Sequence, residues 1–321
     1  MAINVLSLEG KAFVEKKLEN VPKILKQKKA VLWLDILNPT KEDEEFIRKN
    51  FDFESLFISY MTAFNFRPRI IIQPGFVYLS FVSLEYVKGE LKKFPLKFFL
   101  GKNFLITVRN KNLEEISAAK RISTSIKGFT PSRPELLLYL ILDNLTDKYF
   151  PILDEIDDSL DVLETALFKN SRNNLLSDLF EVKHVVLEFR KIISPEREAM
   201  LFLTNRTNAL IDEKSLIYFR DVFDHLIRMQ DMLDTYRDLI TSALDAYLSI
   251  ASNKLNEVMK ILTIFATLLI PLTVVVGFYG MNIDFPEYAL IGKENMFFFI
   301  LGLMVIISLL MLLFFKRKKW L

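Results

Sequence analysis

Two long stretches without a charged side chain constrain this chain more than any other feature. They cover residues 261–283 and 295–315. A helix needs roughly 20 apolar residues to cross the hydrocarbon core of a bilayer, and both stretches reach that length. The other long apolar stretch, residues 94–108, is interrupted by Lys97 and Lys102. The sequence therefore predicts an integral membrane protein that crosses the bilayer twice near its C-terminal end.

The charges beside these two stretches predict the orientation of the chain. Basic residues precede the first stretch and follow the second, whereas the segment between them is mainly acidic. Because basic flanks stay in the cytosol, we expect both termini in the cytosol, a short outer loop, and a multi-pass protein of the plasma membrane. The basic flanks are Lys254, Lys260, Lys316, Arg317, Lys318 and Lys319, and the loop carries Asp284, Glu287 and Glu294 against Lys293.

Bulk composition narrows the function classes. The chain has no cysteine and a formal net charge of +2, which excludes disulfides and thiolate metal sites and gives no reason to expect a nucleic-acid partner. The N-terminus mixes charges into its apolar residues, so no secretory signal is expected there. No phosphate-binding loop, activated nucleophile or zinc-type spacing is visible, so we expect no enzyme. The lack of cysteine together with many Lys and Glu residues favours a prokaryotic source.

The N-terminal part predicts an α+β cytosolic domain. Residues 30–36 form a buried strand candidate, and Thr40 is the expected cap of the next helix, with Asp43 and Glu44 in its first turn. An antiparallel or mixed sheet flanked by helices accounts for the pattern. The further strands are expected at residues 69–73, 75–86, 92–100 and 104–109, joined by turns at 88–90 and 101–103.

Helical spacing dominates after residue 113. One helix is expected over residues 135–168, despite Pro151, and a second over residues 175–204, bent at Pro195. Both are expected to pack on the last helix of the soluble part.

The last helix is expected to be very long. It begins near Ser215, contains Pro271, and continues to Tyr279, so it would extend roughly 100 Å at ~1.5 Å per residue. Only its last third can lie in lipid, so the rest forms a cytosolic stalk. The expected organisation is an α/β domain (1–130), a helical region on the stalk (131–214), the stalk (215–260), a first transmembrane helix (261–280), an outer loop (281–295), a second transmembrane helix (296–315) and a basic tail (316–321).

One stripe of this helix repeats every seven residues. Its cytosolic part carries Asp224, Asp231, Asp238 and Asp245, and it is either a solvated face or a path for cations. Within the membrane the stripe becomes a narrow face with few bulky residues, which either packs against another helix or lines a pore. Two spans cannot enclose a water path, so a pore requires several chains around an axis. The face comprises Asn256, Met259, Leu262, Ala266, Ile270, Thr273, Gly277 and Gly280.

A Tyr-Gly-Met-Asn turn, residues 279–282, follows the first apolar stretch. Gly280 permits a left-handed or otherwise tight backbone, which also suits an ordinary helix C-cap. The position of the turn, between a stalk helix with its span and a short acidic loop, makes it a candidate pore mouth.

These features together resemble the CorA family of magnesium channels. The resemblance rests on residues 279–282, on residues 256–260 before the first span, on Pro-Leu-Thr at 271–273 and on the basic tail at 318–321. It spans essentially the whole chain in the order of its parts. The resemblance implies a homopentamer with a cytosolic α/β funnel and a pore lined by the first span, and it implies Mg²⁺ as the transported and regulatory ion.

The chemistry of the turn fits that implication. Mg²⁺ prefers oxygen ligands and loses its water reluctantly. A ring of Asn282 amide carbonyls, beside Gly280 and Met281, can accept hydrogen bonds from the hydrated ion and still release it. Asp284 and Glu287 of the outer loop would raise the local cation concentration.

The remainder of the pore face has further expected roles. Thr273 would act as a polar relay below the turn. Met259 and Leu262, with Ile270 as a further member, would form an apolar collar that closes by dewetting. Asn256 and Asp245 would offer oxygen rings at the cytosolic mouth.

Regulation in the family implies a cytosolic Mg²⁺ between subunits that holds the channel shut. Asp221 matches the stalk aspartate, and Asp224 and Asp245 are further candidate ligands. The partner acids are expected ahead of an Arg-Pro pair, yet residues 59–60 are Ser-Tyr ahead of Arg-Pro at 67–68. We therefore expect this site to be weaker, bound through water, or displaced.

Several alternatives stay open at this stage. An acidic run from Asp154 to Glu164 either hosts ions or is a solvated face, and His225 is either a metal ligand or structural. The same architecture could carry Co²⁺, Ni²⁺ or Zn²⁺, although few His and no Cys argue against soft ions. A membrane-anchored stalk protein that conducts nothing would leave the joint occurrence of the stripe and the turn unexplained.

Overall fold

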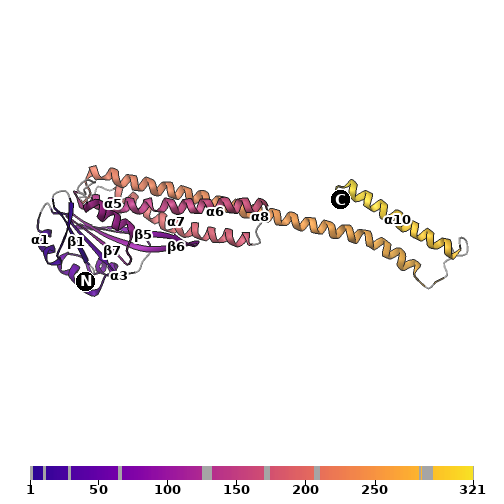
Figure 1. The fold of residues 1–321 in the computed structure, drawn as a ribbon, viewed down its shortest axis with the longest axis horizontal. Coiled ribbons are helices and arrows are strands. Elements are labelled where there is room, and N and C mark those ends of the chain that lie inside the picture. The colour runs from indigo at the N-terminus through magenta and orange to yellow at the C-terminus, as the bar shows by residue number, and fades with distance from the viewer. Residues whose placement is uncertain are drawn as a thin grey trace. The chain divides into compact units, whose positions relative to one another are not determined.

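The computed structural model divides the chain into two compact units, Met1–Leu244 and Asp245–Leu321 (Figure 1). It describes residues 3–9, 12–27, 30–63, 67–124, 132–169, 174–205, 210–281, 283 and 292–320. The helix α8 (Leu216–Tyr279) contributes to both units.

The first unit is built on a seven-stranded mixed sheet with the strand order β2-β1-β3-β7-β6-β5-β4. The neighbours β3 and β7 run parallel, and every other pair is antiparallel. The mixed sheet and the meander of the last four strands confirm the expected fold class; the sequence did not indicate the first two strands. The strands are β1 (Ile3–Glu9), β2 (Ala12–Lys16), β3 (Leu32–Leu37), β4 (Arg69–Ile72), β5 (Phe76–Val87), β6 (Glu90–Gly101) and β7 (Phe104–Arg109).

The long hairpin of β5 and β6 turns through two residues with positive φ. Lys88 has φ 54° and Gly89 has φ 82°, which is the backbone that a two-residue type I′ hairpin requires. The turn expected at Lys88-Gly89-Glu90 is therefore confirmed.

Helices cover both faces of the sheet. One face packs on α1 (Val21–Leu25), α2 (Lys41–Asn50) and α3 (Ser55–Thr62), with Leu32 and Leu34 of β3 in the shared core. Trp33 points to the opposite core, as the alternation of a strand demands. The start of α2 is fixed by a capping box, in which Thr40 and Asp43 each accept from the other's backbone N–H, so the expected cap is confirmed.

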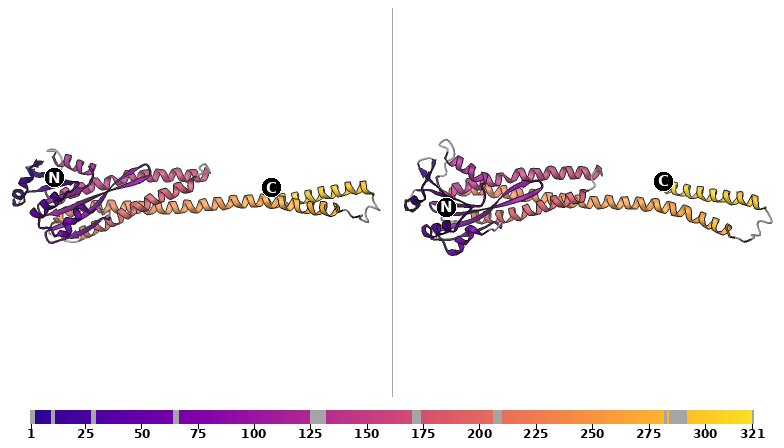
Figure 2. Two further views of the ribbon diagram at one scale, coloured as in Figure 1. Left: turned by 90° about the horizontal axis from the view of Figure 1, so that it is seen from below. Right: turned by 60° about the horizontal axis from the view of Figure 1, so that its bottom comes forward.

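The second layer contains α4 (Glu114–Thr124), α5 (Pro134–Asp147), α6 (Tyr149–Lys169), α7 (Leu175–Asn205) and the first part of α8. Figures 1 and 2 show α6 and α7 side by side. The single helix expected over residues 135–168 is wrong, because the chain breaks at Lys148 into α5 and α6. Pro151 has no N–H to donate to the carbonyl of Asp147, so it cannot make the hydrogen bond that would continue α5. The first turn of a new helix needs no such bond and therefore accommodates a proline.

A buried carboxyl group ties α7 to the sheet. Glu196 is fully buried beside Pro195 of α7, and its Oε1 accepts from the backbone N–H of Val82 at 2.9 Å. The Tyr149 hydroxyl lies 3.1 Å from its other oxygen. Burial raises the pKa of Glu196 well above its usual value, which favours the neutral carboxyl group. The hydrogen bonds of this group hold α6 and α7 against β5.

The second unit contains the remainder of α8 and α10 (Lys293–Arg317), which Figure 1 draws in orange and yellow. Both helices are long and apolar enough to cross a membrane. Their large apolar side chains are mostly exposed: Phe265 is 61% exposed and Phe298 68%. Exposure of this kind is what a helix in contact with lipid or with other copies requires, and the expectation of two such helices is confirmed.

Candidate ion path and metal centre

The predicted pore face lies on the part of α8 that belongs to the second unit. The residue with the least exposure in this part is Ile264, at 7%, and it lies off the predicted face; Leu268, Leu272 and Val275 are half-buried on the same side. Residues of the predicted face are exposed instead. These exposed residues are Asn256, Met259, Leu262, Ala266, Ile270, Thr273, Gly277 and Gly280.

Polar groups on this face are few and oriented by their own helix. The Thr273 hydroxyl donates to the carbonyl of Ile270 at 2.8 Å, which leaves its oxygen lone pairs available as acceptors. Gly277 has open space where a Cβ would be, so packing within the described part of the chain does not require a glycine there.

The turn after α8 is tight because of Gly280. Its N–H donates to the carbonyl of Val276 at 2.8 Å, and a Cβ on Gly280 would lie 2.7 Å from that same oxygen. The backbone of Gly280 does not adopt positive φ, so close approach, rather than a left-handed conformation, is the reason for glycine. Met281 follows with half of its surface exposed. Asn282, Asp284 and Glu287 lie outside the described residues.

The opposite end of the two apolar helices is basic and is held together by a hydrogen bond and a ring contact. The Lys260 ammonium of α8 donates to the carbonyl of Lys319 at 3.0 Å, and Trp320 stacks on Phe315 with ring centroids 5.8 Å apart. Lys316 and Arg317 occupy the last turn of α10, where cations interact favourably with the helix dipole. The basic flanks of the two helices therefore meet at one end of the second unit.

A second candidate site lies in the first unit, where α5 faces α8. Asp143 and Asp147 of α5 and His225 of α8 each place one ligand atom within 4.8 Å of the other two. His225 Nδ1 lies 3.9 Å from a carboxylate oxygen of Asp147, and it is buried without a hydrogen-bond partner. The imidazole stands edge-on to the ring of Phe150, with 5.6 Å between centroids, which fixes its orientation.

The electrostatics of this cluster favour a bound cation. Burial raises the pKa of Asp143, and the negative charges of Asp147 and Asp221 raise it further. Tyr139 responds to the same charges: burial and then Asp143 and Asp221 raise its pKa to about 12. Within the described part of the chain, neither Lys nor Arg forms an ion pair with Asp143, Asp147 or Asp221. Carboxylates and one imidazole without a basic partner are a donor set suited to a divalent cation.

The sequence-predicted regulatory residues separate in the structure. The negative charge of Asp221 raises the pKa of Asp143, so Asp221 interacts with the cluster although it is not one of its three members. Asp224 and Asp245 are exposed and belong to no cluster of three potential metal ligands among the described residues. Asp143 and Asp147 were missed, although their spacing of four residues places them on one face of a helix. His225, expected to be either a metal ligand or structural, lies beside both carboxylates.

Tyr60 takes part in an aromatic and cationic cluster where the resemblance implies an acid. The Arg69 guanidinium lies 4.0 Å from the centre of the Tyr60 ring and 5.6 Å from that of Tyr78. Phe57 also meets the Tyr60 ring edge-on. A cation–π contact of this kind stabilises the guanidinium over the ring, although the buried Nε of Arg69 has no hydrogen-bond partner among the described residues. This side of the protein therefore offers aromatic packing rather than an acidic ligand at position 60.

The acidic run on α6 is exposed. Its members are Asp154, Glu155, Asp157, Asp158, Asp161 and Glu164. The described residues form no cluster of potential metal ligands on this face, and its acidic residues lie on the surface of the single chain.

Comparison with known proteins places this architecture in one family. The model of the CorA-like Mg²⁺ transporter proteins matches residues 28–317. The cobalt/magnesium transport protein CorA of Thermotoga maritima is 32% identical over 99% of this chain and 92% of its own length. The metal ion transporter YfjQ of Bacillus subtilis, whose function is itself inferred, is 28% identical over 94% of both chains.

Solved structures show the same fold. The complete structure of the CorA magnesium transporter of Methanocaldococcus jannaschii aligns with a TM-score of 0.84 at 22% identity, covering 100% of this chain and 99% of that one. The family match over most of the chain and the identity to the Thermotoga protein agree with this fold. The chain belongs to the CorA-like Mg²⁺ transporter family.

Proposed function

We propose that this chain is one subunit of a homo-oligomeric channel that conducts Mg²⁺ passively across the plasma membrane. The observation that carries the proposal is the exposed face of α8 from Asn256 to Gly280, which ends at a turn where only glycine fits. Several copies around an axis, five by family resemblance, would bring these faces together. The membrane potential supplies the driving force, ~2.3 kcal/mol per charge per 100 mV.

Selection of the ion is assigned to the turn. Asn282 amide oxygens around the axis would accept hydrogen bonds from the water shell of Mg²⁺, which is costly to remove. Asp284 and Glu287 would attract cations to the outer mouth, and the basic flanks joined by Lys260 and Lys319 would lie in the cytosol.

The metal centre in the first unit is assigned to regulation by cytosolic Mg²⁺. Asp143, Asp147 and His225 would hold the ion or its water shell, and Asp221 would add charge from α8. Because two of these residues belong to α5 and two to the helix that continues toward the pore, occupancy of the site can bias the position of that helix. Asp224 and Asp245, exposed on the same helix, would supply further negative charge.

A flux assay on purified protein in liposomes tests the main proposal. Wild-type protein should admit Mg²⁺, and Asn282→Ala should reduce the uptake rate by at least tenfold while the oligomer stays intact on size-exclusion chromatography. Asn174→Ala, at an exposed asparagine of the first unit that lies outside α8, is the control and should conduct normally. Normal uptake by Asn282→Ala would refute the role of the turn.

A second candidate function keeps the architecture and changes the ion. The Thermotoga relative is described as a cobalt/magnesium transport protein, and an imidazole in the metal centre accepts Co²⁺ or Ni²⁺ readily. Competition of Co²⁺, Ni²⁺ and Zn²⁺ against Mg²⁺ in the same liposomes decides between them. Absence of flux for every ion would instead favour a membrane-anchored protein that does not conduct.

A further inference from the structure

Lys97 is a buried lysine without an acidic partner. It lies in the middle of β6, between Ser80 of β5 and Val108 of β7, and is 5% exposed. Its ammonium donates to the carbonyl oxygens of Met61, at 3.0 Å, and Ala63 at the end of α3. Across the described residues, no carboxylate forms an ion pair with it. Burying a charge without an opposite charge is costly, so the protein keeps Lys97 there against a free-energy penalty.

Burial, followed by the positive charge of Arg69, lowers the pKa of Lys97 to about 8. The side chain therefore still carries its proton on most molecules at neutral pH. Two carbonyl oxygens occupy two of its three N–H groups, which leaves one donor for another acceptor.

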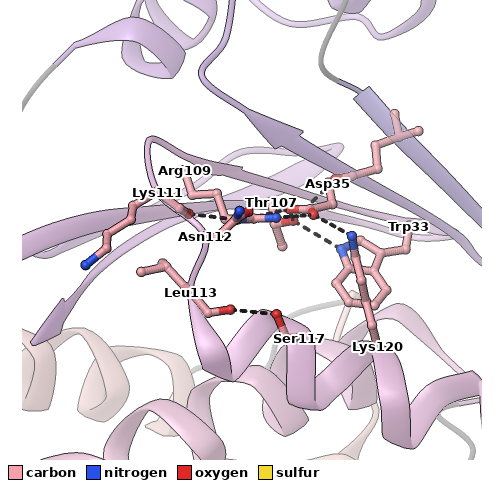
Figure 3. Close-up of polar contacts among 10 residues, drawn as sticks. Trp33, Asp35, Thr107, Arg109, Lys111, Asn112, Leu113, Ser117 and Lys120 are labelled. Atoms are coloured by element: carbon pink, nitrogen blue, oxygen red, sulfur yellow. Dashed lines mark hydrogen bonds and ion pairs between the residues drawn. The ribbon is translucent and has the colours of Figure 1, made fainter.

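The neighbouring cation has all the partners that Lys97 lacks. Arg109 donates to both oxygens of Asp35, at 3.0 and 2.8 Å, and also to the carbonyl of Lys111 and the side chain of Asn112. Lys120 reaches the same Asp35 carboxylate at 2.8 Å. Figure 3 shows this network, in which two cations share one carboxylate. Asp35 and its two cations lie on the face of the sheet that carries Trp33 and Leu96, whereas Lys97 lies on the other face with Phe99 and Val108. This carboxylate is therefore out of reach of Lys97, and the charge that acts on Lys97 is the positive charge of Arg69.

A cavity of about 190 Å³ lies against Lys97. It opens at the edge where the parallel strands β3 and β7 end, because Asn38 follows β3 and Asn110 follows β7. Ligands of open α/β sheets commonly bind at the carboxyl ends of parallel strands. The Asn110 Oδ1 atom is buried and accepts no hydrogen bond. The walls are Asn38, Pro39, Met61, Thr62, Pro95, Lys97, Val108, Arg109 and Asn110.

We propose that this cavity binds a small organic carboxylate that carries a hydroxyl group, such as a short 2-hydroxy acid. The ammonium of Lys97 pairs with the carboxylate, and the Asn110 side chain turns toward the cavity so that its Oδ1, which is buried in the structure, accepts from the hydroxyl. Pro39, Pro95 and Val108 provide apolar walls for the carbon atoms. The volume is below the range of roughly 300–1,000 Å³ that larger ligands require, so it excludes a nucleotide. The proposal is independent of ion transport.

Titration of ¹³C-labelled lactate against the purified full-length protein in detergent, followed by NMR line broadening, tests the proposal. Lactate should bind saturably. Propionate, which lacks the hydroxyl, should bind about tenfold more weakly because Asn110 is left unpaired, and inorganic phosphate should not compete. Lys97→Met should abolish lactate binding, whereas Lys102→Met, at an exposed lysine of the next turn, should bind as wild type does.

A second variant distinguishes loss of binding from loss of folding. Thr62 is exposed at the cavity, so Thr62→Phe should block lactate while leaving the circular dichroism spectrum and thermal unfolding unchanged. Equal lactate affinity in Lys97→Met and wild type, no saturable binding by wild type, or competition by phosphate as strong as that by lactate would each overturn the proposal.

Discussion

Asp35 is buried and Asp143 is half-buried in the same unit, and the charges around the two aspartates have opposite signs. Burial by itself would raise the pKa of Asp35, but hydrogen bonds and charge from Arg109 and then Lys120 outweigh it, so its pKa is lowered. Around Asp143, burial and the charges of Asp147 and Asp221 act together and raise the pKa. The first aspartate has its counter-charges within the chain. Around the second, His225 and Tyr139 offset the negative charges only in part, so its pKa remains raised.

This difference separates a structural ion pair from a candidate binding site. A buried acid that is satisfied by its own chain holds elements together, here β3, β7 and α4. An acid whose neighbours repel it costs stability unless a ligand compensates, which is typical of functional sites.

The largest effect is expected from removing the structural acid. Asp35→Ala leaves Arg109 and Lys120 without their carboxylate, and breaking a buried pair on one side costs about 3–5 kcal/mol. Urea unfolding of the full-length protein, followed by fluorescence, measures this cost. Trp33 is the natural reporter because it donates to Thr107, which in turn donates to Asp35, and Trp320→Phe removes the only other tryptophan.

The control for this measurement is Asp52→Ala. Asp52 is exposed, so its removal should change the free energy of unfolding by about 0.5 kcal/mol or less. An equal effect of the two substitutions would mean that the Asp35 network contributes nothing beyond a surface charge.

The second prediction concerns Mg²⁺ at the Asp143 cluster. A ligand at 100 times its dissociation constant stabilises the folded state by about 2.7 kcal/mol, so Mg²⁺ should raise the free energy of unfolding of the wild type by roughly that amount over a chelator. Asp143→Asn should lose most of this gain. In chelator the same variant should be more stable than the wild type, because one repelling charge is gone.

Asp161→Asn is the control, since it removes an exposed carboxylate from α6 that belongs to no cluster of potential metal ligands among the described residues. It should retain the Mg²⁺ effect. If Asp143→Asn responds to Mg²⁺ as fully as Asp161→Asn does, the cation binds elsewhere and the Asp143 cluster holds no ion.

Much of the fold could be predicted from the sequence because its signals are local. The Thr40 cap, the Lys88-Gly89 turn and the charge-free stretches each follow from a few adjacent residues. The break between α5 and α6 was missed because Pro151 looks like a tolerated kink when helical spacing continues on both sides. The parallel pairing of β3 with β7 joins strands some 70 residues apart, and no local pattern indicates it.

The candidate sites show the same division. The pore face and the turn stay predictions, and the sequence could suggest them because one helix carries them with a regular repeat. The metal centre joins α5 to α8, so Asp143 and Asp147 gain meaning only when His225 is placed beside them. Tyr60 was recognised as a departure from the family, but its contact with Arg69 depends on the pairing of β4 with β5.

The smallest and most diagnostic effect is expected from pH in the presence of a chelator. The folded protein holds the Asp143 proton more tightly than the unfolded chain does, because the folded pKa is raised. Protonation therefore stabilises the fold, and the stability advantage of Asp143→Asn over the wild type should shrink as pH falls from neutral through the raised pKa toward 3.8. For Asp35 the sign is reversed: its lowered pKa gives stability that is present above 3.8 and lost as pH falls through the lower, folded value. Urea unfolding at several pH values measures both differences against the wild type, and two aspartates that respond to pH in the same direction would contradict the contrast between them.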